Sequence, residues 1–251
     1  MNKVIMITGA VRNTGLAVAR QFAAGGWSVA LTSRSADDAR AAAEKLEREF
    51  SVRARGYGMD VESVGSIADV FAQVKADFGR LDAFVANSAN LGIGCGLLGT
   101  AEADFDAIVD VNIKGSFFCC QQAAELMKAD GGSIVTIGSV QGTGAVSGRT
   151  VYGMTKAALS MLVRYMAYEL GRYNIRANNV VAGAIHSTRW DDLSKQELDQ
   201  RRSRYPAGRE SKETEIAAAV WYLCSEQAAT VTGTDLTVDS GLSACLLPYS
   251  K

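Results

Sequence analysis

The chain has 251 residues, of which 48% are hydrophobic and 21% are charged, and its formal net charge is −1 at pH 7. This composition is that of an ordinary globular protein, and it lacks the basic excess expected for binding nucleic acid or an anionic membrane surface. The apolar run in the opening MNKVIMITGA is too short for a secretory signal, and no stretch approaches the ~20 apolar residues that cross a bilayer. We therefore expect a cytoplasmic protein with no nucleic-acid partner and no membrane partner.

Short apolar runs alternate with longer segments of helical periodicity along the chain. Strands are predicted at residues 3–9, 28–34, 81–88, 132–139, 175–183 and 234–241, with a weaker one at 53–61. Helices are predicted at 15–25, 36–50, 63–78, 102–129, 151–173 and 212–228. This alternation predicts the α/β class, as a Rossmann-type doubly wound parallel sheet of about seven strands with helices on both faces. Since there is no internal repeat and no proline-rich linker, residues 1–251 are expected to form a single domain.

The five cysteines are an odd number without CxxC spacing, which favours reduced thiols in a cytoplasm over a disulfide framework. The single histidine, His186, rules out a His-rich metal site, and a Ser-His-Asp arrangement would have to use it. We interpret His186 as a plain loop residue and expect no metal.

Two predicted helical segments, residues 102–127 and 158–170, are apolar on more than one face. A helix that buries only one face within its own subunit normally keeps a polar stripe. We therefore predict a homo-oligomer, with a tetramer favoured and a dimer as the alternative.

The sequence MITGAVRNTGLAVA, residues 6–19, lies where the first strand turns into the first helix. Gly9 and Gly15 allow a tight turn and a helix that starts close to the strand, so its free N–H groups can meet a pyrophosphate. Asn13 stands where a further glycine would be expected, and asparagine tolerates a positive φ better than most residues. A tight turn without a ligand remains the alternative interpretation.

The second predicted strand ends in Ser33 and Arg34. A dinucleotide without a 2′-phosphate usually meets an acidic side chain at this point, and none is present. A hydroxyl and a guanidinium can bind that phosphate, and Arg12 in the first turn could reach the same group. We therefore favour NADP(H) over NAD(H), although Arg34 could simply cap a solvated loop.

Residues 152 to 156 read YGMTK, with Tyr152 and Lys156 one helical turn apart. Such a pair can be an exposed aromatic–cation contact or an acid–base couple, and the motif alone does not decide between them.

Taken together and in order, these motifs resemble the short-chain dehydrogenase/reductase family over essentially the whole chain. The family's TGxxxGxG motif is matched at Thr8, Gly9 and Gly15 and broken at Asn13. Its NNAG turn appears as NSAN from Asn87, and the proline of a later turn is replaced by Ala182. These departures concern turns, so they put cofactor affinity in doubt more than proton transfer.

The resemblance also implies roles for individual residues. Tyr152 is expected to exchange the proton with the substrate oxygen, Ser139 to orient that oxygen, Lys156 to hold the nicotinamide ribose, and Asn112 to keep a water for a proton relay. The expected cofactor-binding residues are Gly9, Arg12, Asn13, Thr14, Gly15, Ser33, Arg34, Asp60, Val61, Asn87, Ser88, Ala89, Tyr152, Lys156, Gly183, Ile185, Ser187 and Thr188.

The tyrosine needs help to act as a base at neutral pH. Lowering a phenol pKa from ~10 to near neutrality needs roughly 4 kcal/mol. An ammonium about 4.5 Å away contributes roughly 3.7 kcal/mol at an effective dielectric of ~20. We therefore expect Lys156 to lower the pKa of Tyr152.

Substrate is expected beyond the carboxyl ends of the strands. The candidate contacts are Leu91, Gln141, Arg149 and Trp190, with a substrate lid at about 188–210. Within this lid, Arg201, Arg202 and Arg204 could meet a phosphopantetheine or a carrier protein, but the segment is also acidic, so a solvated amphipathic helix is favoured.

Residues 206–209, PAGR, together with the last helix and strand, are most similar to the 3-oxoacyl-(acyl-carrier-protein) reductase branch. The expected activity is NADP(H)-dependent interconversion of a ketone and a secondary alcohol on a small-molecule substrate. A sugar, polyol or other small-molecule alcohol dehydrogenase is the alternative within the family. A non-catalytic NADP(H)-binding regulator is the alternative of a different class, and the presence of all four catalytic residue types argues against it.

Overall fold

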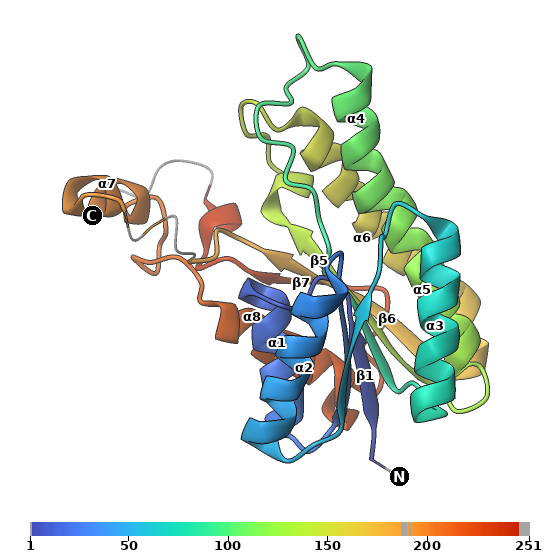
Figure 1. The fold of residues 1–251 in the computed structure, drawn as a ribbon. Helices are drawn as coiled ribbons and strands as arrows, with labels where there is room; N and C mark the ends of the chain where they lie inside the picture. The colour runs from blue at the N-terminus through green and yellow to red at the C-terminus, as the bar shows by residue number, and fades with distance from the viewer. Residues whose placement is uncertain (1, 187–189, 191, 246–251) are drawn as a thin grey trace.

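The computed structural model describes residues 2–186, 190 and 192–245. Seven parallel strands form one sheet in the order β3-β2-β1-β4-β5-β6-β7 (Figure 1). The strands are β1 (Val4–Ile7), β2 (Ser28–Ser33), β3 (Ala54–Gly58), β4 (Ala83–Ala86), β5 (Gly132–Ser139), β6 (Ile175–Ala182) and β7 (Asp235–Val238).

Helices cover both faces of this sheet. On one face lie α1 (Asn13–Ala24), α2 (Ala36–Phe50) and α8 (Glu213–Cys224), and on the other lie α3 (Val64–Phe78), α5 (Ser116–Met127) and α6 (Thr150–Leu170). Alternate residues of β1 divide between the two cores: Ile5 and Ile7 pack under α1, and Met6 packs under α3 and α5. Because both faces are buried, the strand reads as a continuous apolar run, and the predicted doubly wound sheet is confirmed.

Short polar side chains start several of these helices. Ser35 accepts a hydrogen bond from the backbone N–H of Asp38 at the start of α2, and Ser63 accepts one from Ser66 at the start of α3. Gly79 ends α3 with a φ of 75°, in the left-handed region that glycine adopts without strain.

The predicted helix at 102–129 is interrupted in the structure. It consists of α4 (Glu102–Val109), a π-helical segment at Asp110–Gly115 and α5. Hydrophobic periodicity does not reveal such a π segment, because the apolar residues continue through it. A π segment leaves backbone groups outside the regular i→i−4 ladder, and such segments are frequent at functional sites.

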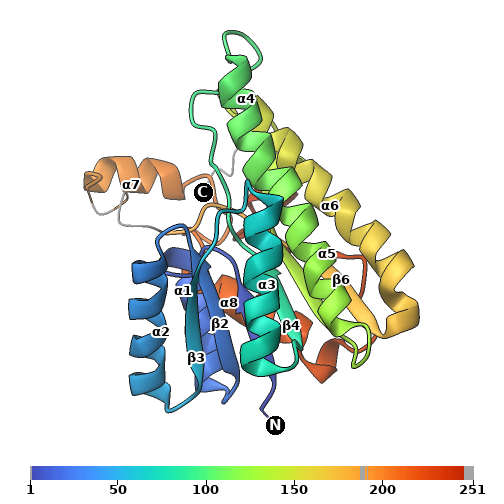
Figure 2. The same cartoon turned by 45° about the vertical axis from the view of Figure 1, so that its right-hand side comes forward.

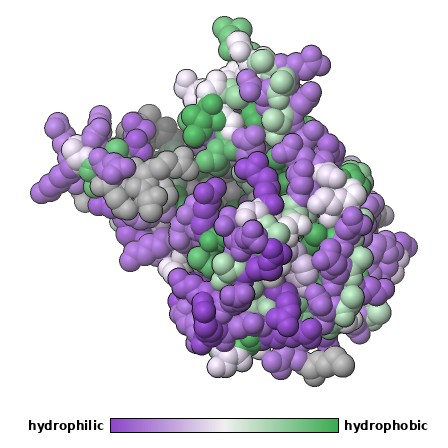
Figure 3. All heavy atoms as spheres, in the orientation of Figure 1, coloured by the Kyte–Doolittle hydropathy of each residue, from purple (hydrophilic) through white to green (hydrophobic). Residues whose placement is uncertain are grey.

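Two helices stand away from the sheet. Helix α4 rises beyond the carboxyl ends of the strands, and α7 (Lys195–Arg202) forms an arm at the side of the molecule (Figure 2). Ser194 and Glu197 cap each other's backbone N–H groups at the start of α7. Figure 3 shows hydrophobic side chains at the tip above α4, where Ile93, Leu97 and Leu98 are exposed. No helix within the described residues is long and apolar enough to cross a membrane.

Gly56 tests the contact between β3 and α2. A Cβ atom at this position would lie 2.0 Å from the carbonyl oxygen of Ala39, a backbone atom that cannot move aside cheaply. We expect Gly56→Ala to lower the free energy of unfolding by at least about 2 kcal/mol, measured by urea denaturation. Gly65 in α3 is the matched control, because its Cβ would meet only Ser63 Oγ at 3.9 Å. Gly65→Ala should be neutral or stabilising by up to about 1 kcal/mol. Equal stability of the two variants would contradict this close packing.

Candidate active site

A cleft of about 1590 Å³ runs along the carboxyl ends of the strands. Its walls come from the turns after β1, β2, β4, β5 and β6, which meet at this edge because all the strands are parallel. The cleft therefore lies at the position where open α/β sheets bind their ligands.

The turn between β1 and α1 is shaped for close approach to a ligand. Gly9 has a φ of 61°, and Asn13 at the start of α1 has a φ of 50°, so the asparagine adopts the left-handed conformation that its residue type permits. A Cβ on Gly15 would lie 2.5 Å from the Gly9 carbonyl oxygen. Gly9, Arg12, Asn13, Thr14 and Gly15 all line the cleft. This cradle fits the pyrophosphate of a dinucleotide, with the first N–H groups of α1 directed towards it.

Asn87 joins the turns after β1 and β4. Its side-chain amide donates to the carbonyls of Thr8 at 2.9 Å and Gly9 at 3.0 Å. In return, the Thr8 hydroxyl accepts from the backbone N–H groups of Asn87 at 2.9 Å and Ser88 at 3.0 Å. These four bonds fix the spacing of the two turns at the point where the strand order reverses.

The far end of the cleft is basic. Ser33, Arg34 and Arg12 line it, and neither arginine belongs to an ion pair within the part of the chain that the structure describes. Lys45 lines the same region from α2. These cations supply the charge that a 2′-phosphate requires.

Of the predicted Asp60-Val61 pair, only Val61 lines the cleft. Asp60 is exposed, and its carboxylate accepts from the backbone N–H of Glu62 at 3.0 Å, while its own N–H donates to Ser66. Asp60 therefore organises the turn after β3. Ser88, Ala89, Gly183 and Ile185 line the cleft as expected. The predicted contacts Ser187 and Thr188 lie outside the described residues.

Tyr152 and Lys156 lie on the inner face of α6. Tyr152 is 8% exposed and Lys156 is 4% exposed, and the ammonium nitrogen lies 5.5 Å from the centre of the phenol ring. Lys156 donates to the Ile137 carbonyl at 2.7 Å. Ser139, at the end of β5, lies near enough to the phenol to lower its pKa, and it accepts from the Gln141 N–H at 3.2 Å. All three side chains line the cleft, so this is no exposed aromatic–cation pair.

The pKa values differ from the expectation. Burial raises the pKa of the Tyr152 phenol above its ordinary value, while the hydrogen bond with Ser139 and the charge of Arg149 oppose this rise. Burial also lowers the pKa of Lys156 to about 8. The expected lowering of the Tyr152 pKa by Lys156 is therefore wrong for the protein chain alone, because desolvation of the phenol outweighs the charges around it.

Asn112 lies in the π segment, is 1% exposed and does not line the cleft. Its amide oxygen accepts from the Asn90 N–H at 2.7 Å, and its amide nitrogen donates to the Asn90 carbonyl and to the Thr155 hydroxyl. Asn90 in turn accepts from the Gly92 N–H. Asn112 therefore fixes the segment that leads into the substrate side of the cleft.

The four predicted substrate contacts, Leu91, Gln141, Arg149 and Trp190, all line the cleft. Arg149 donates to the Leu91 carbonyl, and its guanidinium carbon lies 5.8 Å from the centre of the Tyr152 ring. Gln141 Oε1 is buried and has no hydrogen-bond partner among the described residues. By contrast, Leu97 and Leu98 from the same glycine-rich segment as Leu91 are 82% and 91% exposed and do not line the cleft.

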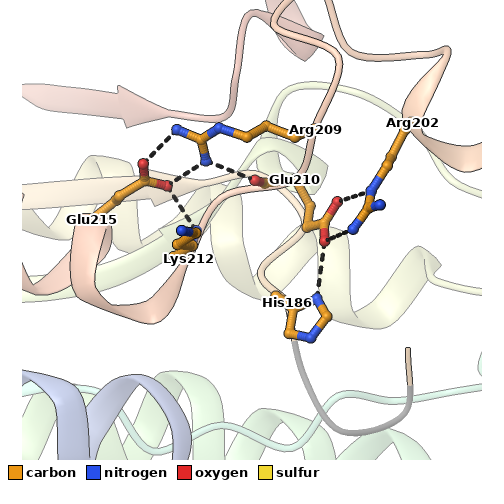
Figure 4. A network of polar contacts seen from close by, with 6 residues as sticks. All are labelled: His186, Arg202, Arg209, Glu210, Lys212 and Glu215. Carbon is orange, nitrogen blue, oxygen red and sulfur yellow. Dashed lines mark hydrogen bonds and ion pairs between the residues drawn. The ribbon is translucent and has the colours of Figure 1, made fainter. Parts of the chain in front are cut away.

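A buried carboxylate ties α7 to the turn after β6 (Figure 4). Glu210 is 5% exposed and accepts from Arg202 Nε and Nη2, both at 2.8 Å, and its Oε1 lies 2.9 Å from His186 Nδ1. The hydrogen bonds from Arg202 hold the pKa of Glu210 at about 2. The predicted basic cluster is therefore divided: Arg202 turns inward, while Arg201 lies over the Trp190 ring at 5.4 Å.

Sequence reasoning missed His186, which lines the cleft as well as contacting Glu210 and so is more than a plain loop residue. Nothing in the local sequence links it to a residue 24 positions away. Lys45 could have been predicted from the sequence, because it follows Arg34 at helical spacing. Asp38, Ala41, Ala42 and Lys45 all line the cleft on this face.

No group of three or more His, Cys, Asp or Glu side chains suited to a metal occurs in the described portions of the chain.

Glu210→Gln tests the contact with α7. A carboxyl whose pKa is lowered on folding contributes stability above its unfolded pKa of ~4.3, and that stability is lost as the pH falls towards the folded value of about 2. We expect the free energy of unfolding of the variant to be about 2–3 kcal/mol lower than that of the wild type at pH 7. Between pH 4.5 and pH 2, the variant should lose less stability than the wild type. Chemical denaturation across this pH range measures both effects. If the variant lost as much stability as the wild type between pH 4.5 and pH 2, the proposed effect of Glu210 on stability would be contradicted. Glu226→Gln, at a carboxylate whose side chain is 94% exposed, is the control.

Comparison with known proteins agrees with this geometry. A family model described as enoyl-(acyl carrier protein) reductase matches residues 9–243. The chain is 34% identical over 246 residues to the (2S)-[(R)-hydroxy(phenyl)methyl]succinyl-CoA dehydrogenase subunit BbsD of Thauera aromatica, covering 96% of this chain and 97% of the relative. It is 31% identical to the 3-oxoacyl-[acyl-carrier-protein] reductase FabG of Aquifex aeolicus, again covering 96% and 97%.

Among solved structures, a gluconate 5-dehydrogenase from Burkholderia cenocepacia in complex with NADP and tartrate superposes with a TM-score of 0.91. Its sequence identity is 28%, and the match covers 98% of this chain and 97% of that one. The fold and the near-complete coverage of both chains accord with these relatives. The chain is an oxidoreductase of the short-chain dehydrogenase/reductase family.

Proposed function

We propose that the protein is an NADP(H)-dependent oxidoreductase that interconverts a ketone and a secondary alcohol. The observation that supports this most directly is that the Tyr152 phenol and the Ser139 hydroxyl line one large cleft, beside the buried ammonium of Lys156. Two hydroxyl donors in one cleft are suited to holding a carbonyl oxygen and giving it a proton.

In the reductive direction, Tyr152 gives its phenolic proton to the substrate oxygen, and Ser139 donates a second hydrogen bond to that oxygen. The dinucleotide, when bound, supplies the hydride. Lys156 would hold the nicotinamide ribose hydroxyls and keep a positive charge near the phenol. The oxidised nicotinamide adds a further positive charge, which acts against the effect of burial on the phenol pKa.

Asn112 contributes to this mechanism by a backbone group. Its side-chain amide makes three hydrogen bonds, two with Asn90 and one with Thr155, which use both of its N–H groups. A relay water would therefore bind the main-chain carbonyl of the π segment, where the regular helical ladder is broken.

The preference for NADP(H) rests on charge at the far end of the cleft. Arg12 and Arg34 face it from two different turns, and Ser33 stands where a carboxylate would repel a 2′-phosphate. The gluconate 5-dehydrogenase structure that resembles this chain contains NADP.

For the substrate we propose a ketone resembling a 3-oxoacyl thioester, because FabG acts on 3-oxoacyl-[acyl-carrier-protein] and BbsD is named for a coenzyme A thioester. A sugar acid, polyol or other small alcohol is the second candidate, favoured by the similarity to gluconate 5-dehydrogenase. In either case residues 188–210, which include α7, would act as a lid over a cleft formed by a single domain.

We also propose a homo-oligomer, with a tetramer favoured over a dimer, in the cytoplasm. Helices α4, α5 and α6 expose large apolar side chains that a partner copy would cover: Phe105, Phe117, Met154, Met161, Tyr165 and Tyr168. Light scattering at micromolar concentration tests this, and a monomeric mass would contradict it.

Replacing Tyr152 by phenylalanine removes only the proton donor. We expect Tyr152→Phe to lower kcat by at least about 100-fold, since positioned acid–base groups contribute roughly that factor or more. The affinity for NADPH, measured by fluorescence titration, should stay within about threefold of wild type, because the ring and its packing remain. Tyr222→Phe, at a tyrosine on α8 that is 38% exposed and does not line the cleft, is the control. Turnover near wild type in Tyr152→Phe would exclude the mechanism.

Replacing Arg34 tests the cofactor preference. Arg34→Leu should lower kcat/KM for NADPH by about 10-fold or more through loss of a charge-assisted contact, and change kcat/KM for NADH little. Arg40→Leu, on α2 outside the cleft lining, should change neither. A wild-type preference for NADH would contradict the assignment of NADP(H).

A further inference from the structure

The side of the cleft that holds Tyr152 carries an unpaired arginine. Arg149 precedes α6, is half-buried and lines the cleft, and its guanidinium carbon lies 5.8 Å from the centre of the Tyr152 ring. No ion pair of Arg149 occurs among the described residues. A half-buried cation beside the reacting group therefore lacks its counter-charge within the described protein.

Arg149 is also held in place. One of its terminal nitrogens donates to the Leu91 carbonyl across the cleft wall, which uses one of the five N–H donors of the guanidinium. The remaining donors are available to an anion, and the fixed fork suits a carboxylate in particular. The guanidinium of Arg149 is therefore preorganised to bind an anion, unlike that of a solvated surface arginine.

The surrounding wall is mostly cationic. From Asn87 onward, the described residues that line the cleft include three cations, Arg149, Lys156 and Arg201, and one carboxylate, Glu213. Lys156 is committed to the Ile137 carbonyl, and Arg201 lies over the Trp190 ring. Arg149 also lies close to the Tyr152 ring, and its one hydrogen bond, to the Leu91 carbonyl, leaves most of its N–H donors without a partner among the described residues.

Gln141 offers a second polar contact on this side. Its side-chain oxygen is buried without a partner among the described residues, and no hydrogen bond of its amide nitrogen is found there either. Turning this amide therefore breaks no existing bond, so its N–H group can be presented to an anion without loss. An unpaired buried amide is costly, and a ligand that engages it recovers that cost.

We propose that the substrate carries a carboxylate close to its carbonyl carbon, that Arg149 binds this carboxylate, and that Gln141 assists. The substrate class is thus a short oxo acid and its hydroxy acid product, in which the carboxyl group is ionised. In a thioester or an ester the same carboxyl carbon is neutral, so Arg149 discriminates between these forms. This inference rests on the proposed ketone–alcohol activity, and it favours an oxo acid, as in the sugar acid of the second candidate, over the 3-oxoacyl thioester proposed first.

The test compares acetoacetate with methyl acetoacetate, which share the ketone and differ in the charge of the neighbouring carboxyl. With NADPH, the wild-type ratio of kcat/KM for the acid over the ester should be about 10 to 100, the size of a charge-assisted contact. In Arg149→Met the ratio should fall to about one, and in Arg149→Lys it should be intermediate, since charge remains but the fork is lost. The ratio cancels any general effect of Arg149 on the phenol or on the Leu91 segment.

Arg164→Met is the matched control, because Arg164 lies on α6, the helix that Arg149 precedes, is exposed and does not line the cleft. It should keep the wild-type ratio. A wild-type ratio near one, or a ratio that survives in Arg149→Met, would overturn the inference while leaving the ketone–alcohol activity intact.

Calorimetry separates the two proposals if neither ketone is reduced. Acetoacetate is titrated into the NADP⁺-loaded wild type and into Arg149→Met. Binding that depends on Arg149 would support the anion site even though the proposed activity had failed. Absence of binding to the wild type, or equal binding to both proteins, would overturn the anion site itself.

Discussion

The contact between Asn87 and the turn after β1 is the constraint on which the site depends. Strands β1 and β4 are neighbours in the sheet but are followed by helices on opposite faces, so their turns diverge. Four hydrogen bonds between Thr8, Gly9, Asn87 and Ser88 hold the turns at one separation. The glycine cradle lies on one side of this point and the segment leading to Asn90 on the other, so the four bonds set the spacing of these two parts of the cleft.

Burial influences the pKa values of Tyr152 and Lys156 more than the attraction between opposite charges does. The phenol and the ammonium are both removed from water, and each is thereby pushed towards its neutral form, the phenol pKa upwards and the ammonium pKa downwards. A simple pairwise estimate omits this opposing effect of desolvation. The result is a site that favours a protonated phenol, which is the form required to reduce a carbonyl.

The sequence predicted the strands and most of the helices because β1, β4 and β5 are buried on both faces and their helices carry regular apolar spacing. It also located the Tyr152 and Lys156 pair, the left-handed Asn13 and the four side chains on the substrate side. What it could not predict depends on contacts between distant residues. The π segment around Asn112 is set by tertiary packing, and the His186 contact with Glu210 joins residues that no local pattern connects.

The buried Glu210 limits how this enzyme can be recombined with its relatives. Its two partners come from separate parts of the chain, Arg202 on α7 and His186 before it. A chimera that received a foreign arm at residues 188–209 would keep the carboxylate and lose the guanidinium, and would strand a negative charge in an interior position. A graft of this arm therefore has to include positions 186 and 210.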